Sequence, residues 1–118
     1  MGKQMVRLDP DTLELTPVAG NHNDLKTLQG LVGGLIELVR GDQGIDVWID
    51  EEGRLKDLLP SAMIRHRLGY SVSVRGPVVF VVPRSTSPED SIARVQRMFV
   101  PLQWSQSTES APPPPSAR

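Results

Sequence analysis

The chain has 118 residues and a nearly balanced charge, with 13 basic residues (Lys and Arg) against 14 acidic residues (Asp and Glu) and a formal net charge of -1 at pH 7. The length predicts one domain with a modest hydrophobic core, and the balanced charge excludes a global field that recruits nucleic acid or an anionic membrane. The chain has no cysteine, which excludes a disulfide framework and a thiolate metal site. No apolar run approaches the roughly 20 residues that cross a bilayer, and residues 1–9 lack the apolar core of a signal peptide. We therefore expect a cytoplasmic protein with no membrane partner.

The first third of the chain predicts two strands and one long helix. Residues 4–8 and 13–18 read as strands on either side of a turn at residues 9–12, which is rich in aspartate and proline. Residues 24–40 are expected to form a single helix, because apolar residues recur there at alternating spacings of three and four. This apolar stripe consists of Leu25, Leu28, Val32, Leu35 and Val39.

The middle of the chain begins with a strand over residues 45–49. Its alternation places Ile45, Val47 and Ile49 on one face and Trp48 on the other. The acidic turn that follows, residues 50–53, predicts a type I turn with glycine in the left-handed conformation.

The remaining elements are shorter. The chain is expected to return as a strand over residues 55–59, followed by a short helix over residues 60–69. Strands are predicted over residues 72–74 and 78–82, and the second of these is a continuous apolar run, which indicates a central strand covered on both faces. A last helix is predicted to start at a Ser87 cap and to stop before Pro101.

Beyond Trp104 the composition changes to proline and small polar residues. The sequence therefore predicts a single α+β domain over residues 1–104 and a disordered tail over residues 105–118. The domain is expected to hold a small, mostly antiparallel sheet of about five strands with two main helices.

A family resemblance rests on four features in chain order. The first is the pattern Asp24-Leu25-Lys26-x-Leu28-Gln29-x-x-Val32-Gly33-Gly34-x-Ile36-Glu37. An apolar strand, an acidic turn ending in Glu-Glu-Gly and the triplet Leu58-x-Pro60 follow it. Over residues 24–82 the chain resembles a family of small uncharacterised proteins, a domain of unknown function found in actinobacterial and related genomes, plasmids and phages. The resemblance implies an accessory protein of a mobile element, and it implies no reaction.

The glycines of the first predicted helix are its most unusual feature. A glycine inside a helix costs about 1 kcal/mol relative to alanine, so we expect a close packing partner to offset the cost of Gly30, Gly33 and Gly34. A strand or a second copy of the helix would fit there, which makes this face a candidate homodimer seam. Phosphate cradles place glycines before a helix rather than inside one, so a bound phosphate is the weaker interpretation.

Carboxylates and histidines suggest little chemistry. Glu37, Asp46 and Asp50 are the residues on which a metal-dependent hydrolase would be built, but the acidic turn is too short for a calcium loop and turn chemistry explains it. His22 and His66 have no ligand-like partner at helical or hairpin spacing. The sequence therefore indicates no enzyme, no metal and no cofactor.

Arginines offer one alternative site. Arg65, Arg67 and Arg75 flank the predicted middle elements and would bind a phosphate or carboxylate if they converged. Aromatic residues are few (two Trp, one Tyr and two Phe), which argues against a stacking platform for single-stranded nucleic acid.

The sequence predicts a non-enzymatic binding or adaptor protein of unknown partner. Its predicted contact residues are Trp48, Glu51 and Glu52 on the acidic-turn hairpin, or Gly33 and Gly34 on the first helix. The alternative is a binder of a small nucleotide-like or phosphate-bearing anion through the three arginines, and the metal-dependent hydrolase is the remote third interpretation.

Overall fold

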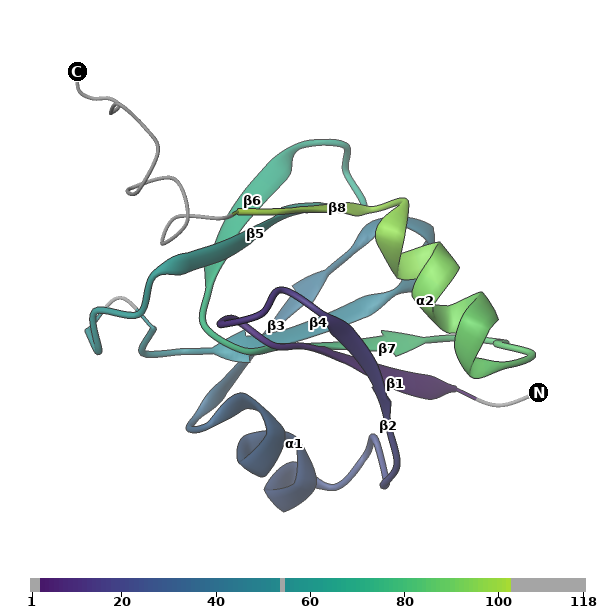
Figure 1. Ribbon diagram of the computed structural model, residues 1–118, viewed down its shortest axis with the longest axis horizontal. Coiled ribbons are helices and arrows are strands. Elements are labelled where there is room, and N and C mark those ends of the chain that lie inside the picture. The colour runs from purple at the N-terminus through teal and green to yellow at the C-terminus, as the bar shows by residue number, and fades with distance from the viewer. Residues whose placement is uncertain (1–2, 54, 103–118) are drawn as a thin grey trace.

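The computed structural model of the protein describes residues 3–53 and 55–102. Within these residues, eight strands form two antiparallel sheets that pack with two helices (Figure 1). This confirms the predicted α+β class, the mostly antiparallel five-stranded sheet and the two helices. The elements are β1 (Gln4–Leu8), β2 (Leu15–Val18), α1 (Leu25–Val32), β3 (Ile36–Arg40), the short 3-10 turn η1 (Asp42–Gly44), β4 (Asp46–Asp50), β5 (Pro60–Arg65), β6 (Ser71–Arg75), β7 (Val78–Val82), α2 (Pro88–Gln96) and β8 (Phe99–Pro101).

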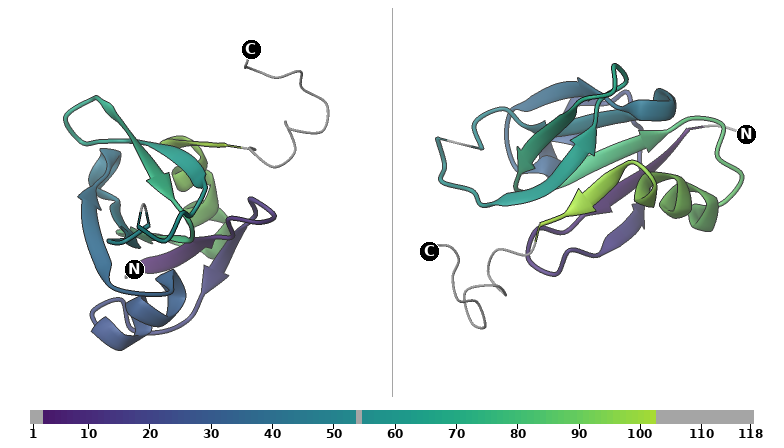
Figure 2. Two further views of the ribbon diagram at one scale, coloured as in Figure 1. Left: turned by 90° about the vertical axis from the view of Figure 1, so that its left-hand side faces the viewer. Right: turned by 90° about the horizontal axis from the view of Figure 1, so that it is seen from above.

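The five-stranded sheet has the order β2-β1-β7-β4-β3, and the three-stranded sheet has the order β6-β5-β8. Figure 1 shows α1 below the larger sheet, with the smaller sheet and α2 above it. Viewed from the side in the left panel of Figure 2, β2 and β3 form the opposite margins of the larger sheet. The larger sheet is therefore the middle layer of the molecule, and each of its faces carries part of the hydrophobic core.

Strand β7 lies at the centre of the larger sheet, and all five of its residues are buried. Phe80 and its alternate neighbours face the main core, which the smaller sheet and α2 cover, whereas Val79 and Val81 face a second cluster beneath α1. The prediction of a strand covered on both faces is confirmed. Strand β4 follows the predicted alternation, with Ile45, Val47 and Ile49 toward the main core and Trp48 toward the second cluster.

The turn between β1 and β2 is held by Asp9, whose carboxylate accepts the main-chain N–H groups of Asp11 and Thr12 at 2.8 and 3.3 Å. These two donors stabilise the ionised carboxylate and hold the pKa of Asp9 below its usual range. The predicted strands around this turn are confirmed, although β2 begins two residues later than expected, at Leu15.

The prediction of one helix over residues 24–40 is wrong beyond Val32. Helix α1 starts at an Asp24 cap, as expected, but it ends at Gly33, whose φ of 96° is the left-handed conformation of a helix C-cap. Residues Ile36–Arg40 form β3 instead and pair along their full length with β4. Leu35 and Val39 have the spacing of the helical stripe only by coincidence, because Leu35 lies in the turn before β3 and Val39 lies in β3 itself.

The region after the acidic turn also differs from the prediction. Gly53 is not in the left-handed conformation, and residues 55–59 form turns and irregular structure rather than a strand. The predicted helix over residues 60–69 is β5 in its first part, because Ala62 and Ile64 alternate into the main core and β5 pairs with both β6 and β8. Tertiary pairing has overridden the local helix-start signal of proline and serine.

Helix α2 begins as predicted, with the Ser87 side chain accepting the Asp90 N–H and Pro88 at the first helical position. It ends at Gln96, so Phe99, which was expected inside the helix, lies in β8 and packs against the main core. Pro101 then falls on a sheet edge rather than after a helix.

The predicted division into a domain over residues 1–104 and a tail over residues 105–118 remains a prediction, because residues 103–118 lie outside the described part of the chain. Neither helix found in the described residues has the length and apolar character that crossing a bilayer requires.

Candidate functional site

The two sequence features that stand out most, the paired glycines and the acidic turn, meet in space. The Asp50 carboxylate is almost fully buried and accepts the Glu52 N–H and the Lys56 ammonium, each at 2.8 Å. The same ammonium donates to the Gly33 carbonyl at 3.3 Å, so Lys56 also satisfies a carbonyl at the end of α1. The Glu51 N–H extends the β3–β4 ladder by donating to the Leu35 carbonyl at 2.8 Å. We call this unit the acidic-turn lobe: residues 33–35, 50–53 and 55–59.

The glycines have separate roles in this lobe. Gly33 supplies the left-handed φ of the helix cap, and a Cβ added there would meet nothing within 4 Å. Gly34 makes room for the ion pair, since its Cβ would come within 2.5 Å of the Lys56 Nζ and 3.4 Å of an Asp50 carboxylate oxygen. Gly30 is the one of the three inside α1, and it faces open space. The glycines therefore shape a turn and an ion-pair niche rather than a flat helix face for a second copy.

Gly34→Ala is expected to destabilise the protein by about 1 kcal/mol, because the new methyl group displaces Lys56 from Asp50. In a Lys56→Ala background the same change should cost nearly nothing. Chemical denaturation of the four proteins of this cycle measures the coupling directly. Gly30→Ala is the control and should stabilise the protein by about 0.5–1 kcal/mol, since it only improves helix propensity. An equal cost of Gly34→Ala in both backgrounds would rule out this role of the glycine.

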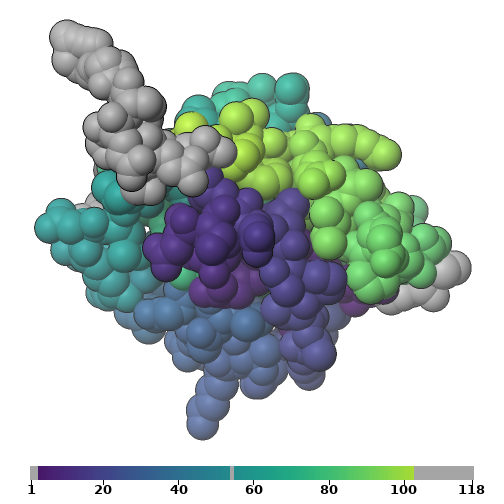
Figure 3. All heavy atoms as spheres, in the orientation of Figure 1, coloured from purple at the N-terminus to yellow at the C-terminus, as the bar shows by residue number. Residues whose placement is uncertain are grey.

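The acidic-turn lobe carries exposed leucines that the core does not use. Leu35, Leu55 and Leu59 are 50%, 84% and 60% exposed. In the space-filling view the teal part of the lobe projects at the left of the molecule (Figure 3). In the same lobe, Glu51 is exposed and Glu52 is partly buried. Apolar side chains on a firmly tied projection, with acidic neighbours, are typical of a protein contact surface.

Trp48 lies elsewhere. It is partly buried and packs against the cluster formed by α1 and the larger sheet, including Leu28 and Val32. The structure therefore brings Gly33, Gly34, Glu51 and Glu52 together in the lobe and leaves Trp48 beneath α1, where it supports the sheet.

A cleft of about 240 Å³ adjoins the lobe. Its apolar part comes from Val39 and Ile49 on the larger sheet and from Val72 and Val74 on β6. Glu37 and Asp50, two residues of the hydrolase hypothesis, line it with Glu51, Gly53, Ser73 and Arg75. Asp50 is already occupied by Lys56, and Arg75 donates to the Leu58 carbonyl at 2.8 Å.

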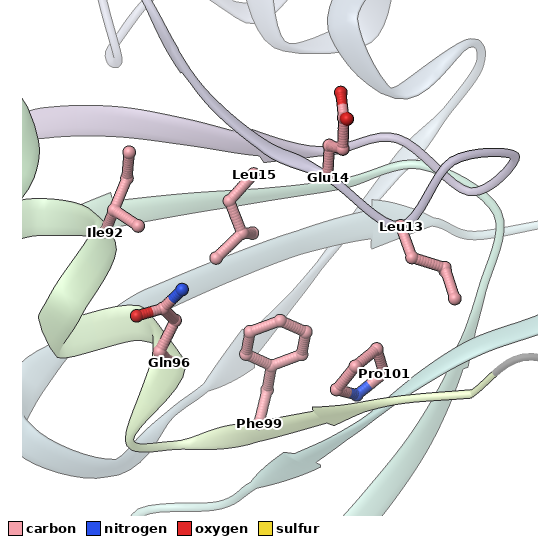
Figure 4. Close-up of a pocket in the computed structure, with 7 residues that line it drawn as sticks. All are labelled: Leu13, Glu14, Leu15, Ile92, Gln96, Phe99 and Pro101. Atoms are coloured by element: carbon pink, nitrogen blue, oxygen red, sulfur yellow. The ribbon is translucent and has the colours of Figure 1, made fainter.

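A second cavity of about 430 Å³ lies on the opposite side of the molecule, between the β1–β2 hairpin, α2 and β8. Figure 4 shows Leu13 and Leu15 on one side of this space and Phe99 and Pro101 on the other, with the Glu14 carboxylate pointing away from them. Among the described residues that line it, five are apolar when Pro101 is included, and Glu14 is the one charged group. The lining is Leu13, Glu14, Leu15, Ile92, Gln96, Phe99 and Pro101.

The three arginines of the anion hypothesis do not form one site. Arg65 pairs with Ser71 at one end of the β5–β6 hairpin, and Arg75 pairs with Pro60 at the other. Four residue steps along β6, from Ser71 to Arg75, separate the two ends, which is about 13 Å. Arg65 lies 3.9 Å from the Asp42 carboxylate, and Arg67 is exposed in the turn after β5.

The carboxylates of the hydrolase hypothesis are also separated by their partners. Asp46 lies 3.3 Å from Arg40, whereas Asp50 binds Lys56. In the part of the chain that the structure describes, no three His, Asp or Glu side chains are grouped to hold a metal ion. His66 stacks on Tyr70 with ring centroids 4.3 Å apart and also accepts the Leu68 N–H, so its role there is in the hairpin turn.

Sequence reasoning missed the residues that define the lobe. Lys56 was not singled out, and Leu55 and Leu59 were assigned to a strand. One signal was available: a lysine follows the acidic turn in a segment whose apolar residues, Leu55, Leu58 and Leu59, have the i, i+3, i+4 spacing of a helical turn rather than the alternation of a strand.

The comparisons with known proteins bear on this chain through one family. The model of the Domain of unknown function (DUF3846) matches residues 3–100, so the chain belongs to this family. Neither the curated proteins nor the solved structures gave a match to the chain.

Proposed function

We propose that this protein is a non-enzymatic binding module that contacts a protein partner through the acidic-turn lobe. The observation that carries the proposal is the set of exposed leucines, Leu35, Leu55 and Leu59, on a projection tied down by the half-buried ion pair of Asp50 and Lys56. Isolated exposed leucines are ordinary, but three within one lobe offer apolar surface whose burial would favour association.

The local construction supports a preformed contact surface. The Asp50 carboxylate and the Lys56 ammonium connect the turn to the end of α1, and the Glu51 N–H connects it to β3. A surface that is ordered before binding loses less conformational entropy when the partner docks. Glu51 and Glu52 would form a polar, negatively charged rim, which favours a partner with a basic rim around an apolar centre.

The anion-binding alternative needs arginines that converge on one cavity, and no observation in the described residues favours it over the lobe. Association with a mobile element and a cytoplasmic location remain predictions that rest on the sequence.

The test is partner binding by a matched set of leucine variants. A tagged form of the protein is used to capture its partner from the cells that encode it, and the partner is then purified for affinity measurements. Leu55→Ala and Leu59→Ala are expected to weaken binding about five- to tenfold each, the effect of truncating an anchor at an interface. Leu68→Ala is the control, because Leu68 is 72% exposed but lies in the β5–β6 hairpin turn.

All three variants should melt within a few degrees of the original protein, since exposed leucines contribute little to its stability. Full affinity in both lobe variants, or equal losses in the lobe variants and in Leu68→Ala, would contradict the proposed surface.

A further inference from the structure

The outer edge of β3 has main-chain groups that are free to pair. The Glu51 N–H bonds to the Leu35 carbonyl, and the Gly41 N–H bonds to the Ile45 carbonyl. These bonds fix the phase of the antiparallel ladder, in which alternate residues of a strand bond to the same neighbour. Glu37 and Val39 therefore bond to β4, and the N–H and C=O groups of Ile36 and Leu38 point away from the sheet. None of the hydrogen bonds of the described residues takes up these outward groups.

One outward main-chain group of β3, the Arg40 carbonyl, already has a main-chain partner. The Arg67 N–H donates to the Arg40 carbonyl at 3.0 Å, beside the isolated bridge between Gly41 and His66. Pairing on the outer side of β3 is therefore limited to Arg40, and the outward main-chain groups of Leu38 and Ile36 are left without a strand partner.

The edges on the opposite side of the molecule are built differently. The Asp9 N–H bonds to the Glu14 carbonyl, so alternation along β2 turns the main-chain groups of Pro17 away from β1. The Leu102 N–H bonds to the Ser61 carbonyl, so the main-chain groups of Pro101 in β8 likewise point away from β5. Proline has no N–H, so it blocks strand addition at outward-facing positions. Strand β3 has no proline and no lysine among its five residues. The fold thus closes the β2–β8 side and leaves the β3 side open.

The 240 Å³ cleft lies on the same side as the open edge. Glu37 and Val39 line it, and residues of an added strand that stand opposite them would point to the same face and so into the cleft. The floor there is apolar, with Ile49 and Val72, and the rim holds the exposed Glu37 and Glu51. Arg75 also lines the cleft, where its guanidinium donates to the Leu58 carbonyl. Among the ion pairs of the described residues, none involves these two glutamates.

The geometry points to strand addition at β3 by an extended segment of the partner protein that carries lysine or arginine at alternate positions. The apolar stem of such a side chain would cover Val39 and Val72, and its charged end would reach Glu37 or Glu51. Main-chain bonds to Ile36 and Leu38 supply the pairing, and the glutamates supply the preference for a basic segment. This inference rests on the proposed binding function and adds the class of partner segment.

The probe is an acetylated and amidated peptide in which lysine alternates with valine, compared with a peptide in which glutamate replaces each lysine. The lysine peptide is expected to bind at least about tenfold more tightly. Glu37→Lys should reverse this preference, a result that general destabilisation does not produce. Glu14→Lys is the matched control, because Glu14 is an exposed glutamate of the other cavity, and it should leave the preference unchanged.

Amide hydrogen exchange locates the binding. The lysine peptide should slow exchange at Ile36 and Leu38, and a version methylated on its alternate main-chain nitrogens should not. Equal binding of both peptides, an unchanged preference in Glu37→Lys, or protection confined to other residues would overturn the proposal. A free protein that is dimeric with protected Ile36 and Leu38 amides would also overturn it, because a second copy would then occupy the edge.

These outcomes separate the two proposals. Failure of the peptide to bind, with partner affinity still lost in Leu55→Ala and Leu59→Ala, refutes strand addition alone. Partner affinity that is intact in the leucine variants refutes the lobe as a binding surface, whatever the peptide does.

Discussion

Phe80→Ala is expected to lower the free energy of unfolding by about 3–5 kcal/mol, the cost of removing a fully buried aromatic side chain and leaving a cavity. Phe80 has no exposed surface and sits in the central strand, opposite Val6 of β1 and Val47 of β4. Its ring lies 5.6 Å from that of Phe99, so it joins the larger sheet to β8 of the smaller sheet. A loss of this size is a large fraction of the roughly 5–15 kcal/mol that stabilises a domain.

Urea denaturation and thermal melting measure this effect. The melting temperature should fall by roughly 4–8 °C for each kcal/mol in a domain near this size. Phe80→Leu is the control, and it should cost only about 1–1.5 kcal/mol because most of the apolar volume is kept. A cost below about 1 kcal/mol for Phe80→Ala would mean that the two sheets do not share the main core.

Asp50→Ala is expected to cost about 2–3 kcal/mol. The Asp50 side chain is 2% exposed and accepts hydrogen bonds from an ammonium and a main-chain N–H, and bonds to charged groups contribute about 1.5–3 kcal/mol. The cost stays below the 3–5 kcal/mol range of fully buried pairs, because the Lys56 side chain is 37% exposed and regains water.

Asp46→Ala is the matched control for Asp50→Ala, since both aspartates belong to β4 and each forms an ion pair with a basic side chain. The Arg40 side chain opposite Asp46 is 57% exposed, so this pair should contribute only about 0–1 kcal/mol. Urea denaturation of both variants gives the comparison. If the two substitutions cost the same, the ion pair between Asp50 and Lys56 does not hold the acidic-turn lobe.

The sequence predicted best where periodicity and core burial agree. Strand β7 is apolar at every position and central in the sheet, and β4 alternates as its two buried clusters require. The start of α2 was predictable because a serine cap and a first-turn proline have local physical causes.

Prediction failed where the local sequence was compatible with both a helix and a strand and pairing with a distant strand determined which of the two formed. Residues 36–40 carry apolar residues at a helix-compatible spacing, but pairing with β4 makes them a strand and turns Gly33 into a helix cap. The strand β5 was missed because its alternation is set by contacts with β6 and β8, which come later in the chain. The paired glycines and the acidic turn could be singled out from the sequence. The lysine that joins them could not be predicted, because Lys56 and Gly33 are 23 residues apart in the chain.

The most direct test of the account is amide hydrogen exchange along β3 in the protein without a partner. Glu37 and Val39 bond to β4, whereas the Ile36 and Leu38 amides point to an open edge. We expect Leu38 to exchange at least about a hundredfold faster than Val39. Comparable protection at Leu38 and Val39 would show that the edge of β3 is already covered, which would contradict an open binding edge beside the acidic-turn lobe.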